Sequence, residues 1–125
     1  MNFFLPENED LVDPHYDFVQ DAYGPDRDGT RTDVYAHEIY GKLHADGILV
    51  SKSTVKEAKA KAIMAAGGIR KYLRLSAGTK VMGDCGAFQF IAEPEPPYTC
   101  EEICDYYEDC GFDFGITLDH LITDF

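Results

Sequence analysis

The stretch Met82-Gly83-Asp84-Cys85-Gly86-Ala87-Phe88-Gln89-Phe90 follows an apolar run and places the carboxylate of Asp84 between two glycines. This order predicts a strand whose carboxyl end opens into a loop, and α/β proteins bind small ligands at that end of a strand. Asp84 offers charge and acceptor oxygens there, while Gly83 and Gly86 let a planar ligand approach the backbone. The alternative role for Asp84 is structural, with its carboxylate accepting hydrogen bonds from amides of the turn.

The composition limits the size and the partners of the protein. A chain of 125 residues suits one domain and is shorter than a complete TIM barrel of about 250 residues. Its net charge of −12 repels phosphate backbones at long range, so composition alone does not suggest a nucleic-acid partner. The sequence contains neither an apolar run of about 20 residues nor a secretory signal, so we expect a cytoplasmic protein without a membrane partner.

Strands alternate with helices in the second part of the chain. One expected helix begins at a capping box of Thr54 and Glu57 and runs through Ala66, and another begins at Thr99 and Glu102 and runs to about Cys110. Glycines follow both. The expected strands are Gly47 to Ser51, Ile69 to Leu75, Lys80 to Met82 and Phe112 to Leu118. This alternation predicts an α/β fold with parallel strands.

The domain organisation that follows has two parts. Residues 1–45 form an irregular, polar leader that is expected to dock on the core, and residues 46–125 form the first βα units. In such a sheet, Asp84 and Asp119 each follow a strand and face the same edge. Together they can recognise donors on a heterocycle, act as acid and base, or bind a metal. The structural alternative for Asp119 is a helix cap.

The four cysteines do not have the spacing of a zinc site. Cys100 and Cys104 share a helical face and could hold a soft metal, but the chain has no CxxC pair. We therefore interpret them as half-buried thiols of a helix and expect no metal site.

One motif links the opening stretch to a known family. Asp84-Cys85-Gly86-Ala87-Phe88-Gln89 resembles the Asp-Ser-Gly-Gly-Phe-Gln signature of the tRNA-guanine transglycosylases. Further segments resemble the start of a paralogous branch, the bacterial and phage 7-deazaguanine DNA transglycosylases: Phe4-Leu5-Pro6, Asp10-Leu11-Val12-Asp13-Pro14, Tyr16-Asp17-Phe18, Arg31-Thr32-Asp33-Val34-Tyr35-Ala36-His37-Glu38 and Gly47-Ile48-Leu49-Val50-Ser51. The resemblance covers essentially the whole chain.

The resemblance implies roles for residues that match the family motifs. It makes Asp84 the catalytic carboxylate of the base pocket, with a role in recognition or proton transfer. It gives Phe88 a stacking role and Gln89 polar contacts, and it makes Asp119 the acceptor for the N1 and N2 donors of guanine. His120, next to Asp119, is a further candidate for the pocket mouth.

Two residues of the signature differ from the family pattern. Cys85 replaces a serine, and a thiol is the poorer donor, so a hydrogen bond made by that serine is in question here. Ala87 replaces the second glycine and has fewer allowed backbone conformations. Cys85 nevertheless stays among the residues expected to bind the substrate.

The resemblance also implies what this chain lacks. Family members use an aspartate nucleophile from the second half of a TIM barrel and a zinc site near the carboxyl end, both beyond Phe125. We therefore expect the N-terminal part of a TIM-type (β/α)8 barrel, truncated after about four strands, with no cofactor of its own. It would need a partner chain or a missing C-terminal half, and it would be inactive alone.

The expected parent activity is base exchange, in which guanine in DNA is replaced by a 7-deazaguanine such as preQ0. One alternative is a tRNA-guanine transglycosylase of the queuine or archaeosine type. Another is a non-catalytic subunit that binds the base. In the leader, His37, Arg27 and Arg31 can contact sugar or phosphate, or can be a structural histidine and surface ion pairs.

Overall fold

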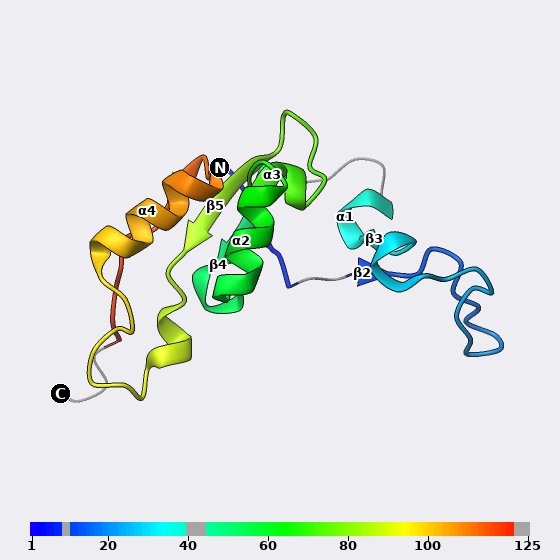
Figure 1. The fold of residues 1–125 in the computed structure, drawn as a ribbon, viewed down its shortest axis with the longest axis horizontal. Coiled ribbons are helices and arrows are strands. Elements are labelled where there is room, and N and C mark those ends of the chain that lie inside the picture. The colour runs from blue at the N-terminus through cyan, green and yellow to red at the C-terminus, as the bar shows by residue number, and fades with distance from the viewer. Residues whose placement is uncertain (9–10, 40–44, 122–125) are drawn as a thin grey trace. The chain divides into compact units, whose positions relative to one another are not determined.

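The computed structural model describes residues 1–8, 11–39 and 45–121, and it forms two compact units. The sheet unit comprises residues 1–7 and 45–125, and the leader unit comprises residues 8–44 (Figure 1). No helix in the described ranges has the length and apolar character needed to cross a membrane.

The sheet unit is an α/β structure built on four parallel strands. The strand order is β1-β4-β5-β6, with bounds Phe4–Pro6, Gly47–Ser51, Lys80–Asp84 and Phe114–Gly115. Two strands match the sequence prediction, β4 fully and β5 with a longer carboxyl end. Strand β1 lies in the segment that was expected to be irregular, so that part of the leader prediction is wrong. Its three residues pair with β4, a partner more than 40 positions away, and no local pattern reports such pairing.

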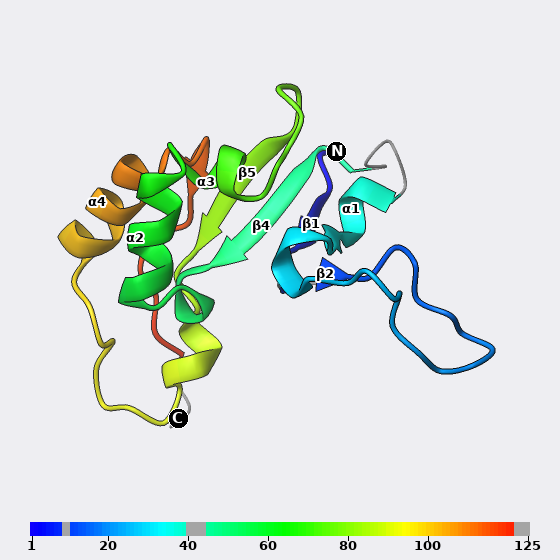
Figure 2. The ribbon, with the colours of Figure 1, turned by 45° about the vertical axis from the view of Figure 1, so that its right-hand side comes forward.

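One face of the sheet carries the core. Ile48, Val50 and Val81 alternate toward this face and are almost fully buried. Helices α2 (Glu57–Ala65) and α4 (Cys100–Cys110) cover it, as Figures 1 and 2 show. Their contributions to the core include Ile63 and Ile103.

Helix α2 begins differently from the prediction. Thr54 does not cap it, because the Thr54 hydroxyl donates to the Ser51 carbonyl (2.8 Å) in the 3-10 turn η2 (Lys52–Thr54). The residue at the N-cap position is Lys56. The predicted end is confirmed, since the helix stops before Gly67 and Gly68, which both have positive φ.

The strand predicted over residues 69–75 is wrong. The segment forms helix α3 (Ile69–Tyr72), and its apolar residues Ile69 and Leu73 are fully buried one helical turn apart. A spacing of four places both side chains on one helical face, whereas short apolar runs fit strand and helix alike. Gly68, at φ 106°, lets the chain turn sharply between α2 and α3.

Helix α4 matches the prediction at both ends. The Thr99 hydroxyl accepts from the Glu102 amide (3.2 Å), and the Glu102 carboxylate accepts from the Thr99 amide (2.7 Å). Gly111 ends the helix in the left-handed conformation. The strand that follows is shorter than predicted, because only Phe114–Gly115 pairs with β5 and the chain then leaves the sheet.

A tyrosine of α4 fixes that helix on two strands. Gly83 and Gly115 are partners in the β5–β6 register, and a Cβ atom at either position would overlap the ring of Tyr107. The Tyr107 hydroxyl donates to the Ile116 carbonyl (3.1 Å). The ring therefore lies directly on sheet backbone, which only glycine permits.

The leader unit contains short regular elements rather than the irregular structure expected. Strands β2 (Leu11–Val12) and β3 (Val34–Tyr35) pair antiparallel, with η1 (Gly29–Arg31) before β3 and α1 (Ala36–Ile39) after it. Residues 9, 10 and 40–44 of the predicted leader lie outside the described residues, as do residues 122–125.

Replacing Gly83 by alanine should destabilise the sheet unit. The new methyl group would displace the Tyr107 ring, and overpacking of this kind costs about 1–3 kcal/mol of unfolding free energy. Urea denaturation followed by circular dichroism measures the loss. The matched control is Gly78→Ala, where nothing lies within 4 Å of the new Cβ and the change should stay within about 0.5 kcal/mol. Equal stability of the two variants would contradict the packing described.

Candidate functional site

Asp84 is the last residue of β5 and begins the loop that forms the site. Its Oδ2 accepts a hydrogen bond from the Gly86 amide (3.0 Å). Among the described residues, Oδ1 has no hydrogen-bond partner. The turn amide bond predicted as the structural alternative is therefore present, but it uses one carboxylate oxygen and leaves the other for a ligand.

The backbone conformation and the close neighbours at position 86 require a glycine. Its φ is 81°, and a Cβ there would lie 2.8 Å from Ser51 Oγ and 2.7 Å from the Cβ of Ser53. The hydroxyls of Ser51 and Ser53 are 2.9 Å apart, so the end of β4 presents a pair of hydroxyls beside this loop. The loop and the end of β4 thus meet closely, as expected for neighbouring parallel strands.

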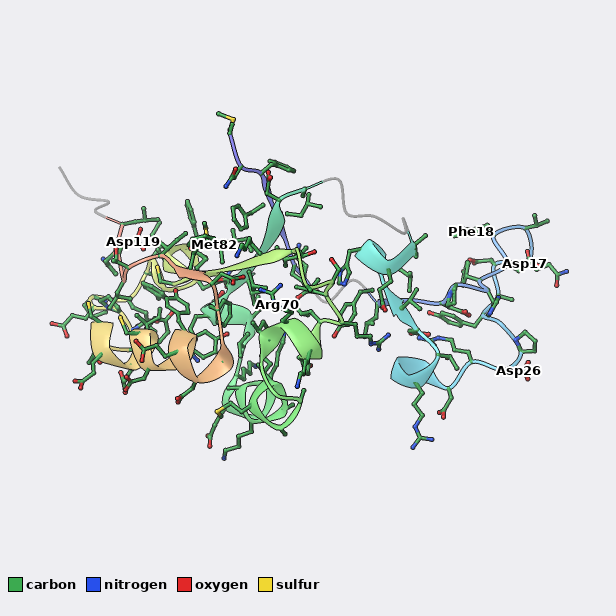
Figure 3. The ribbon with its side chains drawn as sticks, turned by 90° about the horizontal axis from the view of Figure 1, so that it is seen from above. Asp17, Phe18, Asp26, Arg70, Met82 and Asp119 are labelled. Carbon is green, nitrogen blue, oxygen red and sulfur yellow. The ribbon has the colours of Figure 1, made fainter. Side chains whose placement is uncertain are left out.

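Cys85 joins the loop to Asp119. Its thiol donates to Asp119 Oδ1 at 2.7 Å, from a position that is 1% exposed. Burial and then the hydrogen bond to Asp119 raise the pKa of the Cys85 thiol, so it stays protonated and remains a donor. The residue that replaces serine in the signature therefore still makes a donor hydrogen bond. Asp119, which is labelled in Figure 3, therefore lies against the loop that follows β5, and a shared site for Asp84 and Asp119 stays a prediction.

Three aromatic residues stand behind the loop. The Tyr98 hydroxyl donates to the Cys85 carbonyl, and its ring meets Phe90 edge to face at 5.6 Å. Burial, followed by nearby Cys85 and Asp84, raises the pKa of Tyr98 to about 12, so this hydroxyl stays a donor. The His120 ring also stacks on the Phe90 ring, with centroids 6.0 Å apart, and His120 Nε2 lies 2.9 Å from the Glu93 carbonyl.

Sequence reasoning missed Tyr98 and Phe90. Tyr98 follows a proline-rich break and has no motif around it, so the available signal was only a lone aromatic before a helix cap. Phe90 is 4% exposed, while Phe88 of the signature is 78% exposed on the 3-10 turn η3 (Ala87–Phe90). Gln89 is exposed as well. The structure thus brings Cys85, Asp119 and His120 into one network and leaves Phe88 and Gln89 facing solvent.

The other candidates have structural partners. In the leader unit, Arg27 forms a bidentate pair with Asp33 and Arg31 pairs with Asp28, as in the ion-pair alternative. His37 stacks on Tyr35 with ring centroids 5.2 Å apart.

The cysteines of α4 differ from the half-buried thiols that were expected. Cys100 and Cys104 are exposed, whereas Cys110 is buried. Helix periodicity explains the difference, because Cys110 lies on the same face as the buried Ile103 and Tyr106. In the part of the chain that the structure describes, no three histidine, cysteine or acidic side chains lie close enough to hold a metal ion.

The chain is similar to a DNA-guanine transglycosylase. That relative, from Salmonella montevideo, is 35% identical over 131 aligned positions, which cover 98% of this chain. The chain spans 31% of the length of the curated relative. No protein-family model matches the chain. This partial match confirms the family resemblance inferred from the sequence motifs.

The buried phenols and thiols predict a stability that falls in alkali. The pKa values of Tyr98, Tyr106, Tyr107, Cys85 and Cys110 are all raised, chiefly by burial. In the unfolded chain these thiols and phenols lose their protons at lower pH than in the folded chain. The unfolding free energy therefore keeps its full value below about pH 8.5 and falls as the pH rises through the pKa values of the unfolded groups. Urea denaturation between pH 7 and pH 10.5 measures this decline.

The Tyr106→Phe variant isolates the contribution of one phenol to this alkaline loss of stability. Tyr106 is buried and its hydroxyl has no hydrogen-bond partner in the described structure. Its removal should leave stability at pH 7 unchanged or higher by about 1 kcal/mol, and should make the alkaline decline shallower. A stability that is independent of pH up to 10.5 in the parent chain would contradict the burial of these groups.

Proposed function

We propose that this chain supplies the base-binding part of an enzyme that exchanges guanine in DNA for a 7-deazaguanine such as preQ0. The similarity to the DNA-guanine transglycosylase supports the reaction class. The observation that carries the proposal is the hydrogen bond from Cys85 to Asp119 one residue beyond Asp84. This contact ties the segment of Asp119 to the loop that begins at Asp84, and the proposal takes both carboxylates to face the same base.

In this proposal the two carboxylates have different roles. Asp119 accepts from the N1 and N2 donors of the base, and its Oδ1 can accept from Cys85 at the same time because each carboxylate oxygen has two acceptor positions. Such a charge-assisted pair disfavours bases that lack both donors, since such a base would shield the exposed Asp119 carboxylate from water without replacing its hydrogen bonds. Asp84, with Oδ1 available, is the catalytic carboxylate that recognises the base or transfers a proton.

Neighbouring residues complete the pocket. Phe88 has exposed ring faces that suit stacking on a purine, and Gln89 beside it offers an amide for polar contacts. His120, held against Phe90 and the Glu93 carbonyl, fixes the segment that carries Asp119. A base stacked on Phe88 would bury the ring, which is exposed in the free chain.

In this proposal, residues outside positions 1–125 carry out the covalent step. We propose that the four strands are the N-terminal part of a TIM-type barrel, and that a partner chain or a C-terminal part brings the nucleophile and the zinc site. The second face of the sheet supports this, because Phe4 and Phe114 meet there at 6.2 Å and Phe114 is 46% exposed. Parallel sheets are ordinarily covered on both faces.

Calorimetry with guanine and preQ0 tests the site. Asp84→Ala and Asp119→Ala should each weaken binding about 10-fold to 100-fold, because each removes a charged hydrogen-bond partner. Asp105→Ala, an exposed aspartate of α4, is the matched control and should bind like the parent chain. Parent-like affinity in both site variants would refute the assignments, and no binding by the parent chain would refute the pocket itself.

A further inference from the structure

A groove runs between helices α2 and α4 on the outer side of the sheet unit. Its volume is about 400 Å³, and both helices contribute side chains to it. The two helices contact each other, and Figure 2 shows them side by side. The carboxylates of the base site are not among its lining residues.

The floor of the groove is apolar and aromatic. Ala60 and Met64 come from α2, while Tyr106 comes from α4 and Tyr98 from the segment before it. Met64 is 45% exposed, although thioethers usually fill cores or adaptable binding surfaces. The buried hydroxyl of Tyr106 has no partner within the described residues, so the floor also contains an unused polar group.

The rim of the groove is acidic. Glu102, Asp105 and Asp109 project from α4 at spacings of three and four, which places them along one helical face, and Glu57 lies on the α2 side. Glu57 is paired with Lys61 (2.5 Å). No ion pair holds Asp105 or Asp109 among the described residues.

The basic residue that lines the groove is already engaged. Lys52 Nζ donates to the Val55 carbonyl (3.2 Å) and lies 4.6 Å from the centroid of the Tyr106 ring. It therefore sits against the floor and does not neutralise the Asp105 and Asp109 side of the rim.

We propose that this groove binds a basic amphipathic helix of a partner protein. The apolar side chains of such a helix would cover Met64 and Tyr98, and its arginines or lysines would pair with Asp105 and Asp109. Charge decides against other occupants. A second copy of this chain brings another −12, and nucleic acid or an anionic membrane would meet an acidic rim.

The test uses the full chain and a defined probe. The probe is a synthetic amphipathic helix of leucine and arginine, about 18 residues long so that it folds in solution. Fluorescence anisotropy gives its affinity, and amide chemical shifts of labelled protein give its location. The expected shifts lie at Met64, Tyr98 and Tyr106, and Asp105→Lys combined with Asp109→Lys should weaken binding about tenfold.

Non-specific charge attraction is controlled by a matched pair of substitutions. Glu93→Lys combined with Glu95→Lys changes the net charge equally at exposed positions that do not line the groove, and affinity should stay within about twofold of the parent chain. An equal loss in both double variants, shifts on another surface, or no binding to the parent chain would each overturn the proposal. A leucine and glutamate helix of the same length should not bind.

Discussion

The contact of the Tyr107 ring with Gly83 and Gly115 is the constraint on which the sheet unit depends. It fixes α4 on the backbone of β5 and β6, with a hydrogen bond from the phenol to the Ile116 carbonyl. The chain that leaves β6 must then run past the carboxyl end of β5. Asp119 reaches Cys85 because of this path.

The thiol of Cys85 shows how a packing residue also organises a site. It is buried under the loop, which keeps it protonated, and it donates to the carboxylate that is proposed to read the base. A serine would provide the stronger donor at this position. The thiol retains the connection while adding apolar volume to the core.

Local signals in the sequence predicted β4, β5 and α4. These signals are alternating apolar residues, a capping box and a terminal glycine. Each acts over only a few residues, so the neighbouring sequence was sufficient to predict the element. Strand β1 depends on pairing with distant Gly47 to Leu49, and no local signal reports it. The segment from Ile69 was mistaken for a strand because its short apolar run fits both periods.

For the candidate site, the sequence predicted residues rather than contacts. The order of strands along a parallel sheet predicts that Asp84 and Asp119 share an edge. The Tyr98 contact joins residues 13 positions apart, with no strand or α-helix between them, and could not be inferred. Phe88 was expected in the pocket from its motif alone. In the free chain the packed aromatic is Phe90.

The central claim is that this chain supplies the base-binding part of a DNA base exchange, and a hybrid enzyme tests it most directly. The chain would replace the matching 31% of the Salmonella montevideo relative, and incorporation of radiolabelled guanine into DNA and into tRNA would be measured. The account predicts incorporation into DNA that is abolished by Asp84→Ala. A folded hybrid without incorporation, with labelling of tRNA alone, or with full activity after Asp84→Ala would contradict it.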